Sequence, residues 1–273
     1  MAVERLRQRL MPWQESRLGA SLETLATPEV PVVALDARLE LGPPVLAVGL
    51  GGRGVVTVRP DWAPALESAL GGLSYDLLFS IYGAYEISRA TLPHGLTGWG
   101  PYFCMAADEE SFCEADDPRP VYLSGDEIRS TADPKIFWHC LLDESIGGFG
   151  IFDDGQLVSL ASIRVESDEL LEIGIDSAPD QQLRGMGRAV AAAAGRWILE
   201  QGKLVWWTTS TWNVPSSRLS RALGLVHIWS EMIAVPGPFR MPPQPLGAPA
   251  PGAEMRNYYP EWAMNHDIKP RED

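Results

Sequence analysis

The sequence has few of the residues from which metal centres and disulfide frameworks are built. Its three cysteines, Cys104, Cys113 and Cys140, form no CxxC pair, and an odd number of thiols cannot all pair within one chain. The four histidines are scattered without the spacing of paired metal ligands. We therefore predict buried, reduced thiols, no disulfide framework and no metal.

Long hydrophobic runs are also missing. No stretch reaches the length of a membrane span, and the first 19 residues carry charges throughout, without the apolar core of a signal peptide. These absences predict a cytoplasmic protein with no membrane partner.

An excess of basic residues is missing as well. The formal net charge is −14 at pH 7, which would repel a phosphate backbone and argues against nucleic acid as a partner. The same charge would attract cationic amines, although acidity alone identifies no substrate.

The composition is that of a globular protein. A chain of 273 residues with 45% hydrophobic content and 10 Trp can bury one large core or two modest ones. The acidic, proline-containing segment "CEADDPRP" at 113–120 predicts a boundary near residue 118. We expect an N-terminal α/β domain over 1–118 and a second domain over 119–235. The role of the first domain is unknown, and covering an acceptor site is one candidate.

The last segment, 236–273, is rich in Pro and Gly and has no helical or strand periodicity. Its aromatic residues Tyr258, Tyr259 and Trp262 suggest that its end docks either on the body of the protein or on a second subunit. A homodimer is therefore one of the alternatives that the sequence leaves open.

Hydrophobic periodicity predicts the elements of the first half. We expect an amphipathic helix over residues 1–26, three short strands, and helices over 61–70 and 75–91. The strands fall within 31–39, 44–51 and 54–60. The Gly- and Pro-rich segment "PHGLTGWGPYF" at 93–103 is expected to break the last helix.

The second half predicts a mixed central sheet flanked by helices, in the α/β (α+β) class. A strand and a helix start within 121–128, and a helix over 134–145 follows. Two strands within 147–165 are joined by the hairpin dipeptide Asp154-Gly155. Further strands at 170–177, 203–211 and 225–235 alternate with an alanine-rich helix and a helix ending at Leu223.

Two glycines stand at the entrance of the alanine-rich helix, in "PDQQLRGMGRAV". Gly185 and Gly187 would let an anion approach the unsatisfied amides and the positive end of the helix dipole. They would equally permit a tight turn between a strand and a helix. A glycine pair alone is a weak motif and leaves both explanations open. A Rossmann-like dinucleotide site is disfavoured, because the spacing is not GxGxxG.

The residues around these glycines resemble the coenzyme signature of the GNAT superfamily of acyl-CoA N-acyltransferases. In order, that signature consists of Gln or Arg, any two residues, Gly, any one residue, and Gly or Ala. Gln182, Gly185 and Gly187 match it, and Pro179 precedes them. A second family pattern matches within "NVPSSRLSRALGL" at Asn213, Ser216, Arg218, Leu219, Gly224 and Leu225. The resemblance covers about 119–235, and the first half resembles no family that we recognise.

The resemblance implies an N-acetyltransferase that moves an acetyl or short acyl group from acetyl-CoA to a primary amine of a small molecule. In such a fold the strands 170–177 and 204–210 splay apart, the pantetheine arm pairs with the first of them, and the amides from Leu183 to Arg188 cradle the pyrophosphate. The coenzyme-binding residues would be Ile173, Ile175, Gln182, Leu183, Arg184, Gly185, Met186, Gly187, Arg188, Asn213 and Ser216. Arg184 and Arg188 are as readily explained as exposed helix arginines, and Asn213 as a helix cap.

Catalysis would need a base, and the strand 170–177 carries two carboxylates on one face. Glu172 and Asp176 alternate with Ile173 and Ile175, which face the other way. Glu172 is the preferred general base and Asp176 the second choice, against the alternative that Glu172 is a solvated or salt-bridged carboxylate. The backbone amide of Ile175 would stabilise the developing oxyanion.

One position departs from the family. Many members have a Tyr seven residues after the helix-starting Asn, where its hydroxyl meets the coenzyme sulfur, but this chain has Ser220. Either water or a Tyr of the first domain protonates the thiolate, or no dedicated acid is needed. The remaining alternative is a catalytically inactive acyl-CoA sensor or protein-interaction module.

Overall fold

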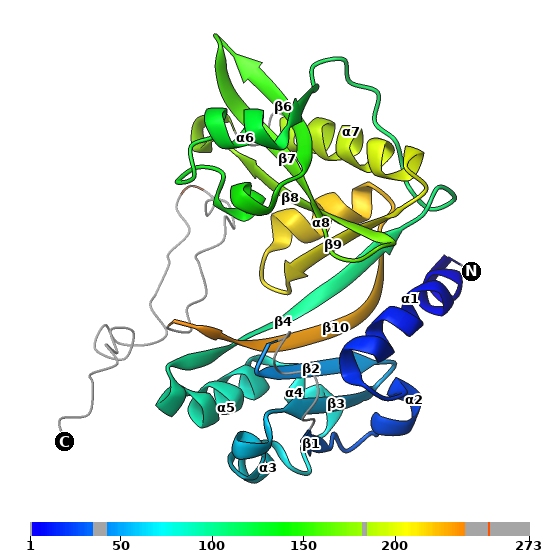
Figure 1. Ribbon diagram of the computed structural model, residues 1–273, viewed down its shortest axis with the longest axis vertical. Helices are drawn as coiled ribbons and strands as arrows, with labels where there is room; N and C mark the ends of the chain where they lie inside the picture. Colours follow the sequence, from blue (N-terminus) through cyan, green and yellow to red (C-terminus); the bar gives the residue numbers. More distant parts are fainter. Residues whose placement is uncertain (1, 35–42, 182–184, 238–250, 252–273) are drawn as a thin grey trace, which may run out of the picture. The chain divides into compact units, whose positions relative to one another are not determined.

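A ten-stranded sheet joins the two halves of the sequence in the computed structural model (Figure 1). The structure describes residues 2–34, 43–181, 185–237 and 251. The strand order is β1-β3-β2-β10-β4-β9-β8-β7-β6-β5, with parallel pairing between β1 and β3 and between β8 and β9. The strands are β1 (Val32–Ala34), β2 (Val45–Leu50), β3 (Arg53–Val58), β4 (Leu96–Ala107), β5 (Val121–Ser124), β6 (Gly147–Asp153), β7 (Gln156–Val165), β8 (Leu170–Ser177), β9 (Leu204–Ser210) and β10 (Val226–Pro236). The mixed sheet flanked by helices confirms the predicted fold class.

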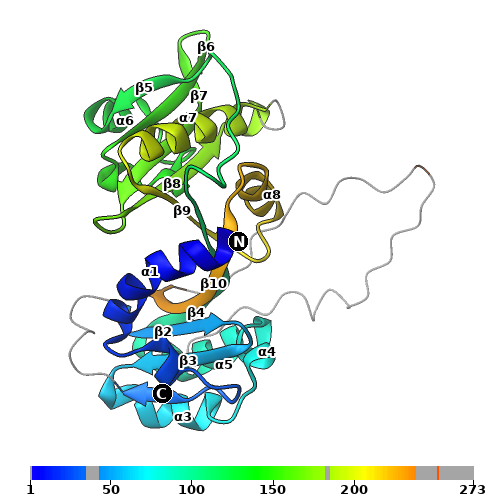
Figure 2. The same ribbon diagram turned by 90° about the vertical axis from the view of Figure 1, so that its right-hand side faces the viewer.

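Helices cover both faces of this sheet. They are α1 (Ala2–Leu18), α2 (Leu22–Leu25), α3 (Ala63–Leu70), α4 (Tyr75–Leu78), α5 (Ile81–Thr91), α6 (Gly125–Thr131), α7 (Met186–Glu200) and α8 (Val214–Ala222). Alternation along β2 shows the layering, because Leu46 and Val48 pack with α1 while Val45 and Ala47 pack with α3 and α5. Figure 2 shows α1 running along β10 and β4.

Towards the β5 edge, α7 covers one face, and α6 with two 3₁₀ turns covers the other. Buried alanines of α7, among them Ala191 and Ala194, pack on Ala161 and Ile163 of β7. On the opposite face Ile128 of α6 packs in a cluster with Leu160 of β7. The small side chains of α7 let that helix lie close to the strands that precede and follow it.

Several local predictions are confirmed. Asp154 and Gly155 have φ angles of 47° and 79° at the turn between β6 and β7, as a two-residue hairpin requires. The strands predicted at 170–177, 203–211 and 225–235 and the alanine-rich helix lie where the sequence places them. In α6, Ser124 and Glu127 form a capping box that fixes the start of the helix.

Other local predictions are wrong. The segment at 93–103 ends the helix as expected, but it also contains most of β4, a strand that was not predicted and that is paired with β9 on one side and β10 on the other. The predicted helix over 134–145 is instead two 3₁₀ turns, Trp138–Cys140 and Leu142–Glu144. The helices predicted over 1–26 and 75–91 are each divided in two, the first after Leu18 and the second before the N-cap Ser80. Cys113 is exposed, whereas Cys104 and Cys140 are buried as predicted.

The described elements all belong to one compact unit, Met1–Met241. The predicted boundary near residue 118 falls between β4 and β5. However, β10, which follows this boundary in the sequence, pairs with β2 and β4, which precede it. The division at 118 stays a prediction. Tyr258, Tyr259 and Trp262 lie outside the described residues. No helix in the described ranges is long and apolar enough to cross a membrane.

Candidate functional site

β8 and β9 part halfway along their length. Their paired residues end with Glu172 opposite Trp206, although β8 stays paired with β7 to Ser177 and β9 stays paired with β4 to Ser210. Each strand is therefore held on its outer side while the inner edges diverge. The splay expected between 170–177 and 204–210 is present.

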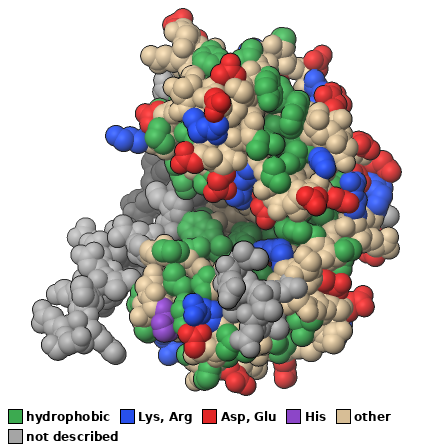
Figure 3. Space-filling view, in the orientation of Figure 1, with side chains coloured by type: hydrophobic (Ala, Val, Ile, Leu, Met, Phe, Trp, Pro, Cys, Tyr) green, Lys and Arg blue, Asp and Glu red, His purple; other side chains and the backbone are tan. Residues whose placement is uncertain are grey.

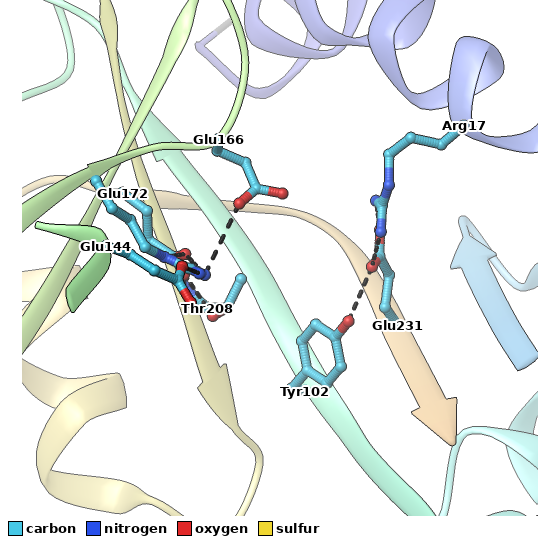
Figure 4. A network of polar contacts seen from close by, with 8 residues as sticks. Arg17, Tyr102, Glu144, Glu166, Glu172, Thr208 and Glu231 are labelled. Carbon is cyan, nitrogen blue, oxygen red and sulfur yellow. Dashed lines mark hydrogen bonds and ion pairs between the residues drawn. The ribbon is translucent and has the colours of Figure 1, made fainter. Parts of the chain in front are cut away.

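The Glu172 carboxylate stands where the ladder stops. Its Oε1 accepts hydrogen bonds from the Thr208 amide at 3.2 Å and from the Thr208 hydroxyl at 2.6 Å (Figure 4). The backbone amide of Thr208 therefore bonds to a side chain at the end of the ladder. Oε2 of Glu172 accepts from Nε of Arg164 at 2.7 Å and also from a terminal guanidinium nitrogen of the same residue. Glu172 is 4% exposed. We infer that this buried carboxylate helps to hold the two strands apart.

The same contacts bear on the predicted role of Glu172. A carboxylate has about four lone-pair positions, and the four donors from Arg164 and Thr208 use them all. No acceptor position is left for the proton of an amine. The role of Glu172 as general base stays a prediction, and this geometry corresponds instead to the salt-bridged alternative.

Charge is concentrated around this carboxylate. Arg164 also pairs with the exposed Glu144 at 3.0 Å and lies 3.7 Å from Glu166. Burial, followed by the nearby charge of Glu172, raises the pKa of the Glu166 carboxyl above its usual value. Acidic side chains are also scattered over the face drawn in Figure 3, with basic ones among them.

The backbone of β8 directs the hydrogen-bonding groups of its odd-numbered residues away from β7, towards β9 and the splay. The Ala178 amide donates to the Val158 carbonyl at 2.8 Å, so even-numbered residues exchange hydrogen bonds with β7. Ile173 and Ile175 must then direct their N–H and C=O groups the other way. Their side chains pack on the α7 side of the sheet. This is the orientation that their predicted roles require.

The glycine turn leads directly to the start of α7. Gly185 is the N-cap with φ 77°, and a Cβ there would contact nothing within 4 Å, so its conformation and not its size requires glycine. A Cβ at Gly187 would lie 3.4 Å from the Ile175 side chain and 3.7 Å from Ser177 Oγ. The first turn of α7 therefore sits against the splayed half of β8.

The first amides of α7 lack side-chain help. No side chain caps the helix and its first turn holds no acidic residue, so the described part of this N-terminus offers unsatisfied donors and the positive end of a dipole. Arg188 is exposed and Met186 is partly buried. The predicted ligands Gln182, Leu183 and Arg184 lie outside the described residues.

The start of α8 faces the same region from β9. Asn213 caps the helix, since its side-chain oxygen accepts from the Ser216 amide at 3.2 Å, as the structural alternative predicted. The Ser216 hydroxyl accepts from Nε1 of Trp207 at 2.9 Å. Two buried hydroxyls, Thr209 Oγ1 and Ser217 Oγ, have no hydrogen-bond partner among the described residues. Such groups are rare in proteins, where an ordered water or an ion commonly satisfies them.

A feature that the sequence did not reveal lies on the face of β8 that carries Asp176. His139 Nδ1 is 2.6 Å from Asp176 Oδ1, and the His139 amide donates to Oδ2 at 2.8 Å. Gly174 makes this possible, because a Cβ there would lie 2.5 Å from the His139 carbonyl oxygen. Asp176 is thus the partner of a histidine 37 residues away.

A cavity of about 330 Å³ opens next to this pair. Trp138 lines it and also packs on His139, with ring centroids 3.4 Å apart. The other lining residues are Arg129, Ala132, Pro134, Phe137, Leu142 and Asp143. No group of three or more His, Cys, Asp or Glu side chains with metal-binding geometry occurs in the described part of the chain.

Ser220 does not reach the splay. It is 0% exposed, and its hydroxyl contacts Met105 Sδ at 3.2 Å and the Ser217 carbonyl at 3.2 Å. The described structure therefore places no hydroxyl at this position that could protonate a thiolate in the splay.

Replacing Ser220 with Tyr should not create a general acid. Because the site is filled, we expect Ser220→Tyr to lower the free energy of unfolding by about 1–3 kcal/mol through overpacking, whereas Ser220→Ala should change it little. Denaturant unfolding of both variants checks this. An unchanged stability together with faster thiol release would contradict the buried placement of Ser220.

The family comparison covers the part of the chain that contains the splay. Residues 143–229 match the family model described as GNAT acetyltransferase. No curated protein matches the sequence.

Solved structures with a similar arrangement include several acetyltransferases. A putative GNAT-family acetyltransferase from Novosphingobium aromaticivorans DSM 12444 is 19% identical, over 51% of this chain and 66% of that chain, with a TM-score of 0.42. A GCN5-related N-acetyltransferase from Kribbella flavida is 20% identical, over 56% and 64%, with a TM-score of 0.42. A GCN5-related N-acetyltransferase-like protein from Streptococcus suis 89/1591 is 17% identical, over 85% and 97%, with a TM-score of 0.43. The match spans just under two thirds of the first two chains.

Proposed function

Because the chain belongs to the GNAT superfamily through its residues 143–229, we propose that it is an N-acetyltransferase. The acyl donor would be acetyl-CoA or another short acyl-CoA, and the acceptor a primary amine of a small molecule. The observation that carries this proposal is the splay of β8 and β9 against the uncapped start of α7. A cytoplasmic location, and a homodimer as one arrangement of the chain, remain part of the proposal.

The residues around the splay fit a coenzyme with a long amide-containing arm and a charged end. Beyond the pairing of Glu172 with Trp206, the carbonyl of Ile173 and the backbone groups of Ile175 face the splay, where such an arm would pair. The amides at Gly185, Met186, Gly187 and Arg188 would hold the pyrophosphate.

The other coenzyme contacts are proposed on either side of these amides. Asn213 and Ser216 would contact the coenzyme from the start of α8. The remaining proposed ligands, Gln182, Leu183 and Arg184, precede Gly185.

The chemistry divides between donor and protein. The coenzyme supplies an activated acyl group as a thioester. The Ile175 amide, directed into the splay, would donate a hydrogen bond to the thioester carbonyl oxygen as negative charge develops there. The net charge of −14 would favour the approach of a cationic amine.

One observation favours a second candidate function. Ser220 occupies the position of the family's Tyr and is buried, which agrees with an acyl-CoA sensor or protein-interaction module that performs no transfer. Such a protein would bind acetyl-CoA without releasing free thiol.

Two measurements test the proposal and separate the candidates. Calorimetric titration with acetyl-CoA should give a dissociation constant in the micromolar range, about −8 kcal/mol. Thiol release should then accelerate with at least one member of a panel of alkyl diamines, aralkylamines and amino sugars. Binding without release identifies the sensor, and no binding means that the glycines only turn the chain.

A further inference from the structure

His139 and Asp176 form a pair beside the splayed half of β8. Asp176 follows Ile175 on this strand, four residues beyond the last residue paired with β9. Both oxygens of its carboxylate accept from His139, one from the ring and one from the amide. The histidine is thereby fixed in position as well as in ring orientation.

This contact sets the tautomer of the ring. An ionised carboxylate can only accept hydrogen bonds, so the proton of neutral His139 must lie on Nδ1, which is 2.6 Å from Asp176 Oδ1. The lone pair is then on Nε2. The side chain of Asp176 is 12% exposed and that of His139 is 41% exposed. The acceptor nitrogen therefore belongs to the more accessible partner.

The segment that carries His139 is held in an unusual conformation. Leu141 has φ 44° and ψ 60°, a left-handed geometry that a residue with a branched side chain rarely adopts. Cys140 is buried between this segment and the sheet, and the absence of a side chain at Gly174 lets the segment lie close against β8. Strained backbone of this kind persists where surrounding contacts enforce it and is common at functional sites.

We propose that His139 is the general base of the acetyl transfer and that Asp176 is its positioning residue. The inference rests on the proposed function. It replaces Glu172, whose acceptor positions are filled, by Nε2 of His139, which has no hydrogen-bond partner among the described residues. It follows from the chemistry of the pair, because a carboxylate that orients imidazole and fixes its tautomer is the arrangement by which proteins make histidine a proton acceptor.

The proposed step transfers the acyl group directly from sulfur to nitrogen. The amine nitrogen forms a bond to the thioester carbonyl carbon, and the carbon–sulfur bond breaks with its electron pair remaining on sulfur. The proton that the amine loses goes to Nε2 of His139. Solvent then protonates the sulfur and removes the proton from the imidazole, which restores the starting state.

The surroundings of the ring define what else could affect its protonation. Asp176 on β8 is the charged group in contact with it. From β7, the nearest polar group against this segment is the neutral Ser162 hydroxyl, which donates to the Cys140 carbonyl at 2.6 Å. Arg129 and Asp143 line the cavity that Trp138 borders.

The deciding variant is His139→Gln in the full-length protein. We expect its turnover in the thiol-release assay to fall by about 100-fold, with an unchanged dissociation constant for acetyl-CoA by calorimetry. The wild-type rate should rise with pH as the base loses its proton, and the variant should lose this dependence. Imidazole added to the variant should restore part of the rate.

Three further variants separate a base from a structural residue. His94→Gln, at an exposed histidine outside the site, is the matched control and should behave as the wild type. Asp176→Asn should also lower turnover, because an amide no longer enforces the Nδ1–H tautomer. Glu172→Gln removes the other candidate base. The pH dependence of the rate should be kept in this variant, because His139 is still present.

The outcomes distinguish this inference from the proposed function. Unchanged turnover and pH dependence in His139→Gln would overturn the assignment of His139 while leaving the transferase intact. If pH dependence disappears in Glu172→Gln but not in His139→Gln, Glu172 is the base. Wild-type protein that fails to bind acetyl-CoA, or binds it without thiol release, overturns the transferase and with it the base.

Discussion

Gly187→Glu should lower the affinity for acetyl-CoA by at least about 100-fold and leave the fold intact. Two unit charges about 4 Å apart interact with about 4 kcal/mol at an effective dielectric of 20, which corresponds to about a thousandfold in a dissociation constant. A carboxylate in the first turn of α7 would set this repulsion against the pyrophosphate. The measurement is calorimetric titration with acetyl-CoA.

The structure indicates that the protein would tolerate this substitution. The three nearest atoms to a Cβ at Gly187 lie at 3.4 to 4.0 Å, which is ordinary contact distance. A negative charge at the start of a helix also interacts favourably with its dipole. The melting temperature of the variant should therefore be close to that of the wild type.

Two matched variants separate charge at the turn from charge on the helix. Gly187→Ala adds only a methyl group, and Ala is accepted at this position in the family signature, so coenzyme binding should be kept. Ala193→Glu adds the same charge to α7 six residues further on, at a partly exposed position. If Gly187→Glu binds acetyl-CoA as tightly as these two do, the pyrophosphate is not held at this turn.

The sequence predicted the second half of the fold because its signals are local. Alternating apolar residues in 147–165, the Asp154-Gly155 turn and the alanine-rich helix each specify an element without reference to distant residues. The splay was predicted through the family resemblance alone. Period-two alternation predicted that Ile173 and Ile175 share one face, opposite Glu172 and Asp176, and the structure shows that this face packs against α7.

β4 was missed because the interactions that make it a strand come from far away. Gly98, Gly100 and Pro101 give the segment the composition of a loop. The strand is nevertheless paired with β10 from Leu96 onwards and with β9 from Tyr102 onwards. Gly98 also permits close packing, since a Cβ there would lie 2.6 Å from the Ala84 carbonyl oxygen. Long-range pairing and helix packing override the local preference.

The candidate site was predicted in outline and missed in its polar contacts. The sequence placed Glu172 and Asp176 on one strand face, but their partners come from other elements: Arg164 and Thr208 from neighbouring strands and His139 from a 3₁₀ turn. The predicted helix over 134–145 concealed His139. An isolated histidine in the sequence does not indicate a catalytic role. The only available sign was the carboxylate of Asp176, which could have been expected to have a hydrogen-bond partner.

Arg17→Met should lower the free energy of unfolding by about 3–5 kcal/mol, because it leaves a buried carboxylate without its cation. Glu231 is 1% exposed, and Arg17 contacts both of its oxygens, at 2.6 and 3.1 Å (Figure 4). Burial has the largest single effect and lowers the pKa of Arg17, but the charge of Glu231 and its hydrogen bonds to Arg17 act together against it, and the pKa is raised overall. Chemical denaturation measures the loss.

The remaining donors to Glu231 explain why the pair matters beyond one contact. Gln14, Tyr102 and Trp229 donate to the same carboxylate at 2.9 to 3.0 Å. Together with Arg17 they connect α1 to β4 and β10, and β4 is the strand that pairs with β9. Burial, and then the charge of Glu231, raises the pKa of the Tyr102 hydroxyl, so Tyr102 stays protonated and keeps donating.

A matched variant and a double variant make this prediction decisive. Arg9→Met removes an arginine from the same helix, but its pair with Glu169 is exposed on both sides, 42% and 57%, and should cost only about 0–1 kcal/mol. Replacing both Arg17 and Glu231 by Met should cost less than Arg17→Met alone, since no charge is then left buried. If Arg17→Met costs no more than Arg9→Met, Glu231 is not buried as described.

The shape of the unfolding transition tests the predicted boundary at residue 118 in the same experiment. Arg17 lies before this boundary and Glu231 beyond it, and the sheet between them is continuous. We therefore expect Arg17→Met to shift one cooperative transition of the whole unit Met1–Met241. Two separate transitions, of which Arg17→Met moves only one, would instead mean that the N-terminal domain unfolds separately from the rest.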